Sequence, residues 1–304
     1  MFDKQLKSLD QLQRKNRTLG FLFAVYRKAS DDKISSLAAL FAYYALFSIF
    51  PLLLVLVVVL GVLLSSEPWL RQKIVNSALA NFPIIGGQLR TNVGGLRGSG
   101  IDAGVGILAL ILASRSLASL AIRALNDIWN VPNVKRFGFP LSLGKQLLWT
   151  LVVGVGVTLS TFFTGYGSLP IVLGVLISAA INVITFLSAA RIALVRSISF
   201  KSFWRGEVLA ALLWEALQAF GGALVKHNLS HASNTYGFFA IVIGLLTWMY
   251  TQAYLTLLSA ETDIVRENKL WPRSLTGRDP TQGDRKSEQL RMNQIATDED
   301  AVNS

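Results

Sequence analysis

Long uncharged stretches dominate the pattern of polar and apolar residues along this chain. With histidine counted as neutral, no ionised residue occurs at 34–66, 146–190 or 227–260. Each run is longer than the roughly 20 residues that a helix needs to cross the hydrocarbon core of a bilayer. Transmembrane β-strands would alternate in polarity over about ten residues, whereas these runs are continuously apolar. The pattern predicts an all-α, polytopic membrane protein.

Turn-forming and charged residues divide the apolar sequence into six predicted spans. The run at 146–190 is too long for one helix, and the Gly- and Pro-containing sequence at 165–170 is its turn. The first span is longer than a perpendicular helix requires, so we expect it to tilt. The predicted six-helix transmembrane domain covers 34–260, with spans at 34–64, 103–124, 146–164, 170–190, 206–225 and 236–260.

Polar segments flank this domain at both ends. Residues 1–33 are basic, and the apolar residues at 19–26 fit either an amphipathic helix at the membrane interface or a helical extension of the first span. Thirteen of the first 18 residues are polar, and five of these are basic, so no apolar core follows the N-terminus and we expect no cleaved signal peptide. Residues 261–304 are polar and contain Pro and Gly, which predicts a cytoplasmic and largely disordered tail.

Composition and charge agree with a membrane protein of defined orientation. Of the 304 residues 52% are hydrophobic and only 15% charged, and the net charge is +11. Twenty-three of the 29 Lys and Arg residues lie in the two terminal segments and in the loops after the second and fourth spans. The positive-inside rule therefore places both termini in the cytoplasm. Anionic lipid headgroups account for this basic face, and we expect no nucleic-acid partner.

Two ionised residues interrupt the predicted spans. Arg115 lies about 18 Å into the second span at 1.5 Å per residue, and Glu215 lies near the middle of the fifth. A charge in hydrocarbon costs several kcal/mol, so such side chains usually face the bundle interior or a water-filled cavity. Their depths are compatible with an ion pair. The pair either locks the helices or belongs to a solute path, and Arg115 could instead snorkel to the interface.

Further polar residues follow these two along the helices. Ser119 and Asp127 continue the face of Arg115 at steps of four residues, with Asn126 beside them. Gln218 shares the face of Glu215. We expect the two polar stripes to meet in the bundle, where they line either a packed network or a path for a small-molecule solute.

A proline in the first span creates another candidate. Tyr43, Tyr44 and Ser48 bring hydroxyl groups close to Pro51, which lacks an N–H and so frees a backbone carbonyl. We predict a kink at Pro51 that serves as a gate or binding site, or else as a packing device. Gly154 and Gly156 in the third span are predicted to make close helix contacts.

Several chemistries lack their residues in this sequence. There is no cysteine, which excludes disulfides and thiol nucleophiles. No GxxxxGK[ST] motif is present, which disfavours nucleotide-driven pumping. His227 and His231 have helical spacing but no third ligand, so we predict no metal site. We expect no cofactor and no enzymatic activity.

Several sequence segments resemble one family of membrane proteins. Residues 42–52 read Ala-Tyr-Tyr-Ala-Leu-Phe-Ser-Ile-Phe-Pro-Leu, which is similar to the opening signature of the YihY/BrkB family. Further matches are Arg115 with Leu-Asn-Asp-Ile-Trp at 125–129, Leu-Leu-Trp-Glu at 212–215, Tyr-Gly at 236–237, Leu-Thr-Trp at 246–248 and Ala-Glu at 260–261. Together they cover about residues 35 to 263 in the family's order.

This resemblance implies a bacterial inner-membrane protein with six spans, for which transport or efflux is the usual suggestion and virulence a recurring association. The family also carries the label ribonuclease BN-like. Metal-dependent phosphodiester hydrolysis needs clustered carboxylates or histidines, and the sequence has no such cluster. We therefore expect a transporter or permeability protein for an unidentified solute. The alternative is a noncatalytic scaffold that binds lipids or envelope partners through its basic face.

Overall fold

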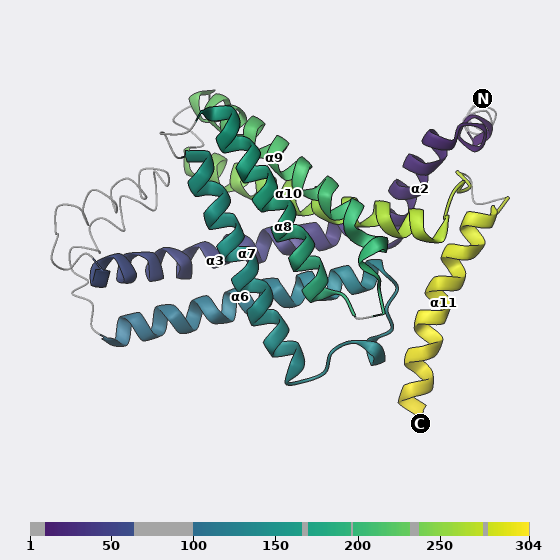
Figure 1. Cartoon of the computed structure of the whole chain (residues 1–304), viewed down its shortest axis with the longest axis horizontal. Helices are drawn as coiled ribbons and strands as arrows, with labels where there is room; N and C mark the ends of the chain where they lie inside the picture. Colours follow the sequence, from purple (N-terminus) through teal and green to yellow (C-terminus); the bar gives the residue numbers. More distant parts are fainter. Residues whose placement is uncertain are drawn as a thin grey trace. The chain divides into compact units, whose positions relative to one another are not determined.

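Helices make up all the regular structure that is described. The computed structural model describes residues 10–63, 100–165, 170–195, 197–231, 237–275 and 279–303. The helices (Figure 1) are α2 (Arg17–Asp31), α3 (Ile34–Leu63), α6 (Gly100–Ile128), the short 3-10 helix η1 (Asn133–Lys135), α7 (Leu141–Gly165), α8 (Ile171–Ala193), α9 (Phe200–His231), α10 (Gly237–Asn268) and α11 (Gln282–Asn303). The all-α class is confirmed for this part of the chain.

Each predicted span corresponds to one long helix, although the helices extend beyond the apolar residues. α9 continues to His231 and α10 to Asn268, because backbone hydrogen bonds do not end where apolar side chains end. Among the described residues, two helices are long and apolar enough to cross a membrane, at Leu141–Thr161 and Val172–Ala193, and Ile34–Ser48 is a shorter apolar helix. Six crossings remain a prediction.

The chain divides into two compact units. One comprises Met1–Phe41, Ala118–Leu224 and Tyr250–Ser304, and the other Ala42–Leu117 and Val225–Met249. The first contains the buried apolar clusters of the described chain, the largest of which joins α2, α3, α6 and α10. The polar network described below belongs to this unit.

α7 and α8 form the hairpin that the sequence predicts, packed along each other (Figure 1). Gly156 makes the contact close, because a Cβ atom there would lie 2.1 Å from Oγ1 of Thr185. Gly174 faces the carbonyl of Phe163 in the same way, with 2.9 Å between a Cβ and that oxygen. The predicted close contact is confirmed for Gly156. For Gly154 it is wrong, since nothing lies within 4 Å of its Cβ position.

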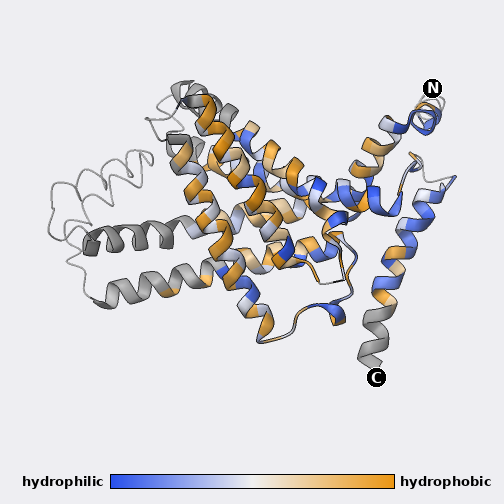
Figure 2. Cartoon of the chain, viewed as in Figure 1, coloured by the Kyte–Doolittle hydropathy of each residue, from blue (hydrophilic) through white to orange (hydrophobic). Residues whose placement is uncertain are grey.

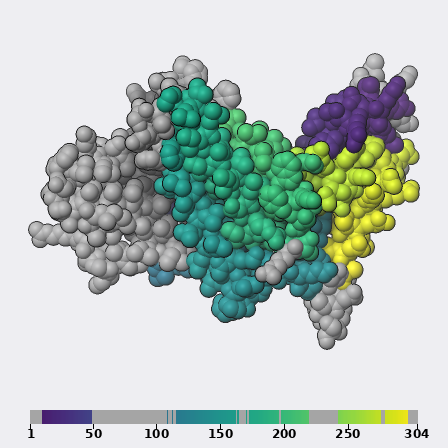
Figure 3. Space-filling model, in the orientation of Figure 1, coloured from purple at the N-terminus to yellow at the C-terminus, as the bar shows by residue number. Residues whose placement is uncertain are grey.

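The outward faces of this hairpin are apolar. Leu151, Leu176 and Ile184 are each more than 60% exposed. Figure 2 shows α7 and α8 largely in the colour of hydrophobic residues, and Figure 3 shows atoms of this part of the chain, in teal and green, at the surface. In the most apolar 18-residue stretch of each helix, only 6% of the residues of α7 and 28% of those of α8 are buried. A core helix of a water-soluble protein would bury these side chains, whereas a bilayer solvates them. The exposed faces therefore favour a lipid environment.

The N-terminal segment forms a separate helix. α2 is capped by Asn16, whose side chain accepts hydrogen bonds from the backbone N–H groups of Thr18 and Leu19. It ends before Lys33, whose positive φ of 54° breaks the helix ahead of α3. α2 is thus not an extension of the first predicted span, and its position at a membrane interface remains a prediction.

The tail differs from the sequence-based expectation of disorder. Its residues 282–303 form α11, and Arg273 joins Asp31 of α2 to Asp284 of α11 with N–O distances of 2.7 and 2.6 Å. The ring of Trp271 packs edge-on against Phe21. Figure 3 shows the two terminal segments in contact, in purple and yellow. The prediction of a largely disordered tail is therefore wrong for these residues, which are held by contacts far apart in sequence.

Candidate functional site

A hydrogen-bond network lies among the apolar side chains of α7, α8 and α9. Oε1 of Glu215 accepts a hydrogen bond from the Ser178 hydroxyl at 2.7 Å and one from the Asn182 amide at 2.5 Å. The amide also donates to Oγ of Ser160 at 2.9 Å, and the two serine hydroxyls are 2.7 Å apart. Since Ser178 gives its proton to Glu215, Ser160 is the donor between the serines. The network therefore ends on the carboxylate of Glu215.

α10 continues this polar layer on the other side of α9. The amide of Gln252 donates to Oε1 of Gln218 at 3.5 Å, and Gln252 is buried. Gln218 follows Glu215 by three residues and shares its face of α9. Glu215 contacts α8, and Gln218 contacts α10. The layer joins four helices.

Only Glu215 and Gln218 of this layer were predicted from the sequence. Ser160, Ser178, Asn182 and Gln252 were not predicted, although Ser178 and Asn182 are spaced four residues apart on one face of an otherwise apolar helix. That spacing was the available signal, because isolated uncharged polar residues are common in helices but a shared face indicates a common partner.

Asn126 and Asp127, at the end of α6, bond to α8 and to the segment that follows α6. Asn126 is buried and donates to the carbonyl of Ala193, at the end of α8, at 2.9 Å. Asp127 pairs with Arg136 at 2.6 Å, and this arginine also donates to the carbonyl of Val131. Asn126 and Asp127 thus fix the end of α6. Ser119, about two turns earlier on the same helix, is partly buried. Their membership of a solute path remains a prediction.

The other predicted residues belong to the second compact unit. The side chain of Arg115 is exposed, and its pairing with Glu215 remains a prediction. The rings of Tyr43 and Tyr44 meet edge-on at 5.6 Å. Ser48 donates to the carbonyl of Ala45 at 2.7 Å within its own helix. Pro51 lies inside the continuous α3, where the kink also remains a prediction.

A second polar centre lies where α2, α6 and α10 meet. Lys28 is only 2% exposed, pairs with Asp32, and donates to the carbonyl of Ile128 at 3.2 Å. Its Nζ is 3.8 Å from Oε2 of Glu261, which is completely buried. In the sequence, Glu261 stood out only as part of a family motif, and nothing there connected it with Lys28 or Asp32.

α9 and α10 approach closely at a glycine. The backbone N–H of Gly206 donates to Oδ2 of Asp263 at 2.7 Å, and a Cβ atom at Gly206 would lie 2.5 Å from the carbonyl of Ser259. Burial raises the pKa of Asp263 to about 6, although the Gly206 N–H and the nearby guanidinium of Arg205 oppose the shift. This contact holds the two helices together at the ends of the predicted fifth and sixth spans.

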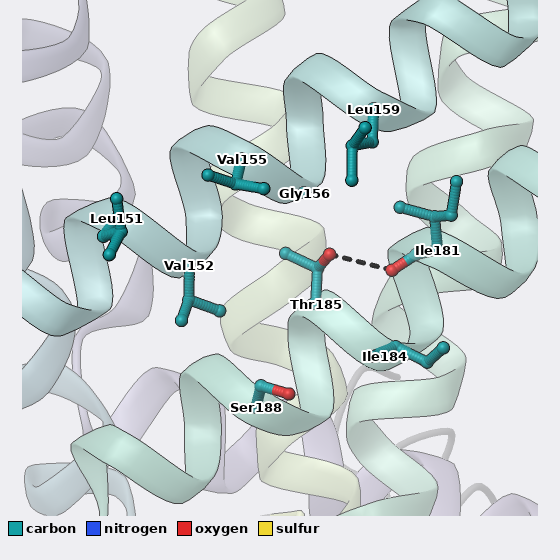
Figure 4. A pocket seen from close by; sticks show the side chains of 9 residues that line it. All are labelled: Leu151, Val152, Val155, Gly156, Leu159, Ile181, Ile184, Thr185 and Ser188. Atoms are coloured by element: carbon teal, nitrogen blue, oxygen red, sulfur yellow. Dashed lines mark hydrogen bonds between the residues drawn. The ribbon is translucent and has the colours of Figure 1, made fainter.

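The hairpin also carries an open groove of about 430 Å³ between α7 and α8 (Figure 4). Its walls are mainly the apolar side chains of Leu151, Val155, Leu159 and Ile184. The hydroxyl of Thr185 is turned to the carbonyl of its own helix, to which it donates at 2.8 Å. The groove therefore suits hydrocarbon better than a polar solute.

Apolar outward faces combined with an internal polar layer define a helical membrane protein. Within that class, residues 25–283 match the family Virulence factor BrkB. Because the match covers most of the chain, the protein belongs to this family, and the resemblance noted in its sequence is confirmed. No curated protein and no solved structure matches the chain.

Proposed function

We propose that this protein is a six-span transporter or permeability protein of the bacterial plasma membrane, with both termini in the cytoplasm. The observation that carries the proposal is the carboxylate of Glu215, held in the apolar bundle by donors from α8. Glu215 is only partly exposed, and placing a carboxylate among apolar helices opposes folding and insertion, so its presence there favours a functional role.

The network also suggests what class of solute would bind. Ser178 and Asn182 both donate to Glu215, and Ser160 is linked to both of them. A solute that carries an ammonium, amide or hydroxyl group could replace one of these donors at the carboxylate. We therefore propose a hydrogen-bond-donating or cationic solute of small size.

Flux measurements in proteoliposomes test this proposal. A panel of radiolabelled cationic and polyhydroxylated solutes would be offered to the wild type and to Glu215→Gln, which keeps the shape of the side chain. We expect flux of one solute class to be lost in Glu215→Gln and reduced in Ser160→Ala. Thr161→Ala is the matched control, since Thr161 is the exposed neighbour of Ser160 and donates to its own helix. Unchanged flux in folded Glu215→Gln would remove Glu215 from the path.

The second candidate is a noncatalytic scaffold that binds lipids or envelope partners. It is favoured by the way the network's donors and acceptors already satisfy one another, as expected of groups that only lock helices together. The basic cytoplasmic segments would then bind anionic headgroups. Replacing exposed Lys and Arg residues there should abolish capture of anionic vesicles and leave the bundle intact. Neither proposal includes an enzymatic step.

A further inference from the structure

Glu261 is buried without the donors that a buried carboxylate requires. It has no exposed surface, and among the described residues no N–H or hydroxyl group donates to either carboxylate oxygen. The ammonium of Lys28 is nearest, at 3.8 Å, which is beyond hydrogen-bond distance. Lys28 is already engaged by Asp32 and by the carbonyl of Ile128. An ionised Glu261 would therefore be a buried charge with no adequate partner.

The surrounding charges lead to the same conclusion. α2 contributes the Lys28 ammonium and the carboxylates of Asp32 and, further away, Asp31. Asp31 is paired with Arg273 and Arg27, and a buried apolar cluster that includes Ile34 of α3 and Ala260 of α10 packs between these helices. One lysine thus faces two close carboxyl groups, and ionising both would leave a net negative charge away from water.

Both carboxyl groups lie beside the same ammonium. Lys28 pairs directly with Asp32 and is 3.8 Å from Oε2 of Glu261, so Asp32 takes the larger share of the positive charge and Glu261 the smaller. Burial raises the pKa of Glu261 well above its ordinary value, with Lys28 opposing the shift and Asp32 adding to it. The side chain of Asp32 is 17% exposed, so it offers a route between solvent and Glu261.

We propose that Glu261, beside Lys28 and Asp32, forms a buried proton-binding site, in which Glu261 holds the proton while Lys28 and Asp32 remain an ion pair. Releasing this proton leaves an uncompensated charge between α2 and α10, and α2 must loosen for water to reach it. The site is separate from the Glu215 network, so it does not depend on the proposed transport function.

Infrared spectroscopy of the full chain in lipid tests the proton directly. At neutral pH we expect the carbonyl stretching band of a protonated carboxylic acid, and its loss in Glu261→Gln. Glu267→Gln, which changes an exposed carboxylate of the same helix, should leave the band unchanged. Asp32→Asn is a second, independent variant, because Lys28 then faces a single carboxylate and Glu261 should ionise. A band whose intensity is the same as in the wild type in Glu261→Gln or in Asp32→Asn would overturn the proposal.

Thiol labelling tests the movement of α2. The chain has no cysteine, and Val25 of α2 is buried against Val265 and Leu270, so Val25→Cys reports on this packing. As pH rises above the pKa of the site, maleimide labelling should accelerate more in the Val25→Cys protein than in the Val25→Cys/Glu261→Gln protein, by up to about tenfold per pH unit. The double variant controls for the intrinsic reactivity of the thiol. Equal pH dependence in both proteins would contradict the proposal.

Discussion

Replacing Gly156 with alanine should weaken the packing of α7 on α8. The new Cβ would lie 2.1 Å from Oγ1, 2.5 Å from Cγ2 and 2.8 Å from Cβ of Thr185. Rotating the threonine cannot relieve the last of these distances, and its hydroxyl is held by the carbonyl of Ile181. The helices must therefore separate locally.

The magnitude follows from comparison with a nearby glycine. Inserting a methyl group into a well-packed contact costs about 1–3 kcal/mol, whereas Gly→Ala in a helix gains up to about 1 kcal/mol from propensity. Gly154 has nothing within 4 Å of its Cβ position, so Gly154→Ala gains propensity without a clash. Because propensity cancels between the two variants, Gly156→Ala should be less stable than Gly154→Ala by about 1–3 kcal/mol.

Reversible unfolding in mixed detergent micelles would measure this difference. The double variant Gly156→Ala/Thr185→Gly moves the missing side chain to the other helix and should recover part of the loss, which the coupling energy of the cycle would quantify. Equal stabilities of Gly154→Ala and Gly156→Ala, with no coupling to Thr185, would refute the close packing of this hairpin.

Other predictions concern Arg273, Asp284 and Asp263, which lie outside the predicted spans. Arg273→Ala should cost about 3 kcal/mol by leaving Asp31 and Asp284 without their buried partner, seen as faster proteolysis of the tail; unchanged proteolysis would contradict this. Burial raises the pKa of Asp284, but hydrogen bonds from backbone N–H groups, a hydroxyl and Arg273 outweigh it and lower the pKa below 3.8, so its contribution to stability is lost as pH falls below that value. The pKa of Asp263 is instead raised from 3.8 to about 6, so the protonated carboxyl stabilises the fold below pH 3.8, and this stability is lost as pH rises to about 6. The loss in the free energy of unfolding should be roughly 2–3 kcal/mol. The Asp263→Asn variant should lack it. Parallel pH profiles of Asp263→Asn and the wild type would contradict that assignment.

The helices of this protein could be predicted from sequence because their signal is local. Long, mainly apolar stretches located α3, α6, α7, α8, α9 and α10, and the Gly- and Pro-containing sequence at 165–170 predicted the division between α7 and α8. The charge of Glu215 marked it as a polar residue of the interior, since ionised groups are rare in such runs. These features depend on residues close together in the chain.

The partners of Glu215 could not be predicted in the same way. Ser178 and Asn182 lie more than thirty residues from it in the chain, and only the packing of α8 against α9 makes them neighbours. The ordered tail was missed for the same reason. Its polar composition resembles that of disordered segments, and the contact between Arg273 and Asp31 spans 242 residues.

The central claim is that the outward faces of the hairpin lie in hydrocarbon while its polar side chains turn inward. A spin label on Leu176→Cys, at a 61% exposed position of the otherwise cysteine-free chain, tests this in liposomes. The account predicts that lipid-soluble oxygen relaxes the label more strongly than a water-soluble nickel chelate. Stronger relaxation by the nickel chelate would place α8 in water and contradict the account.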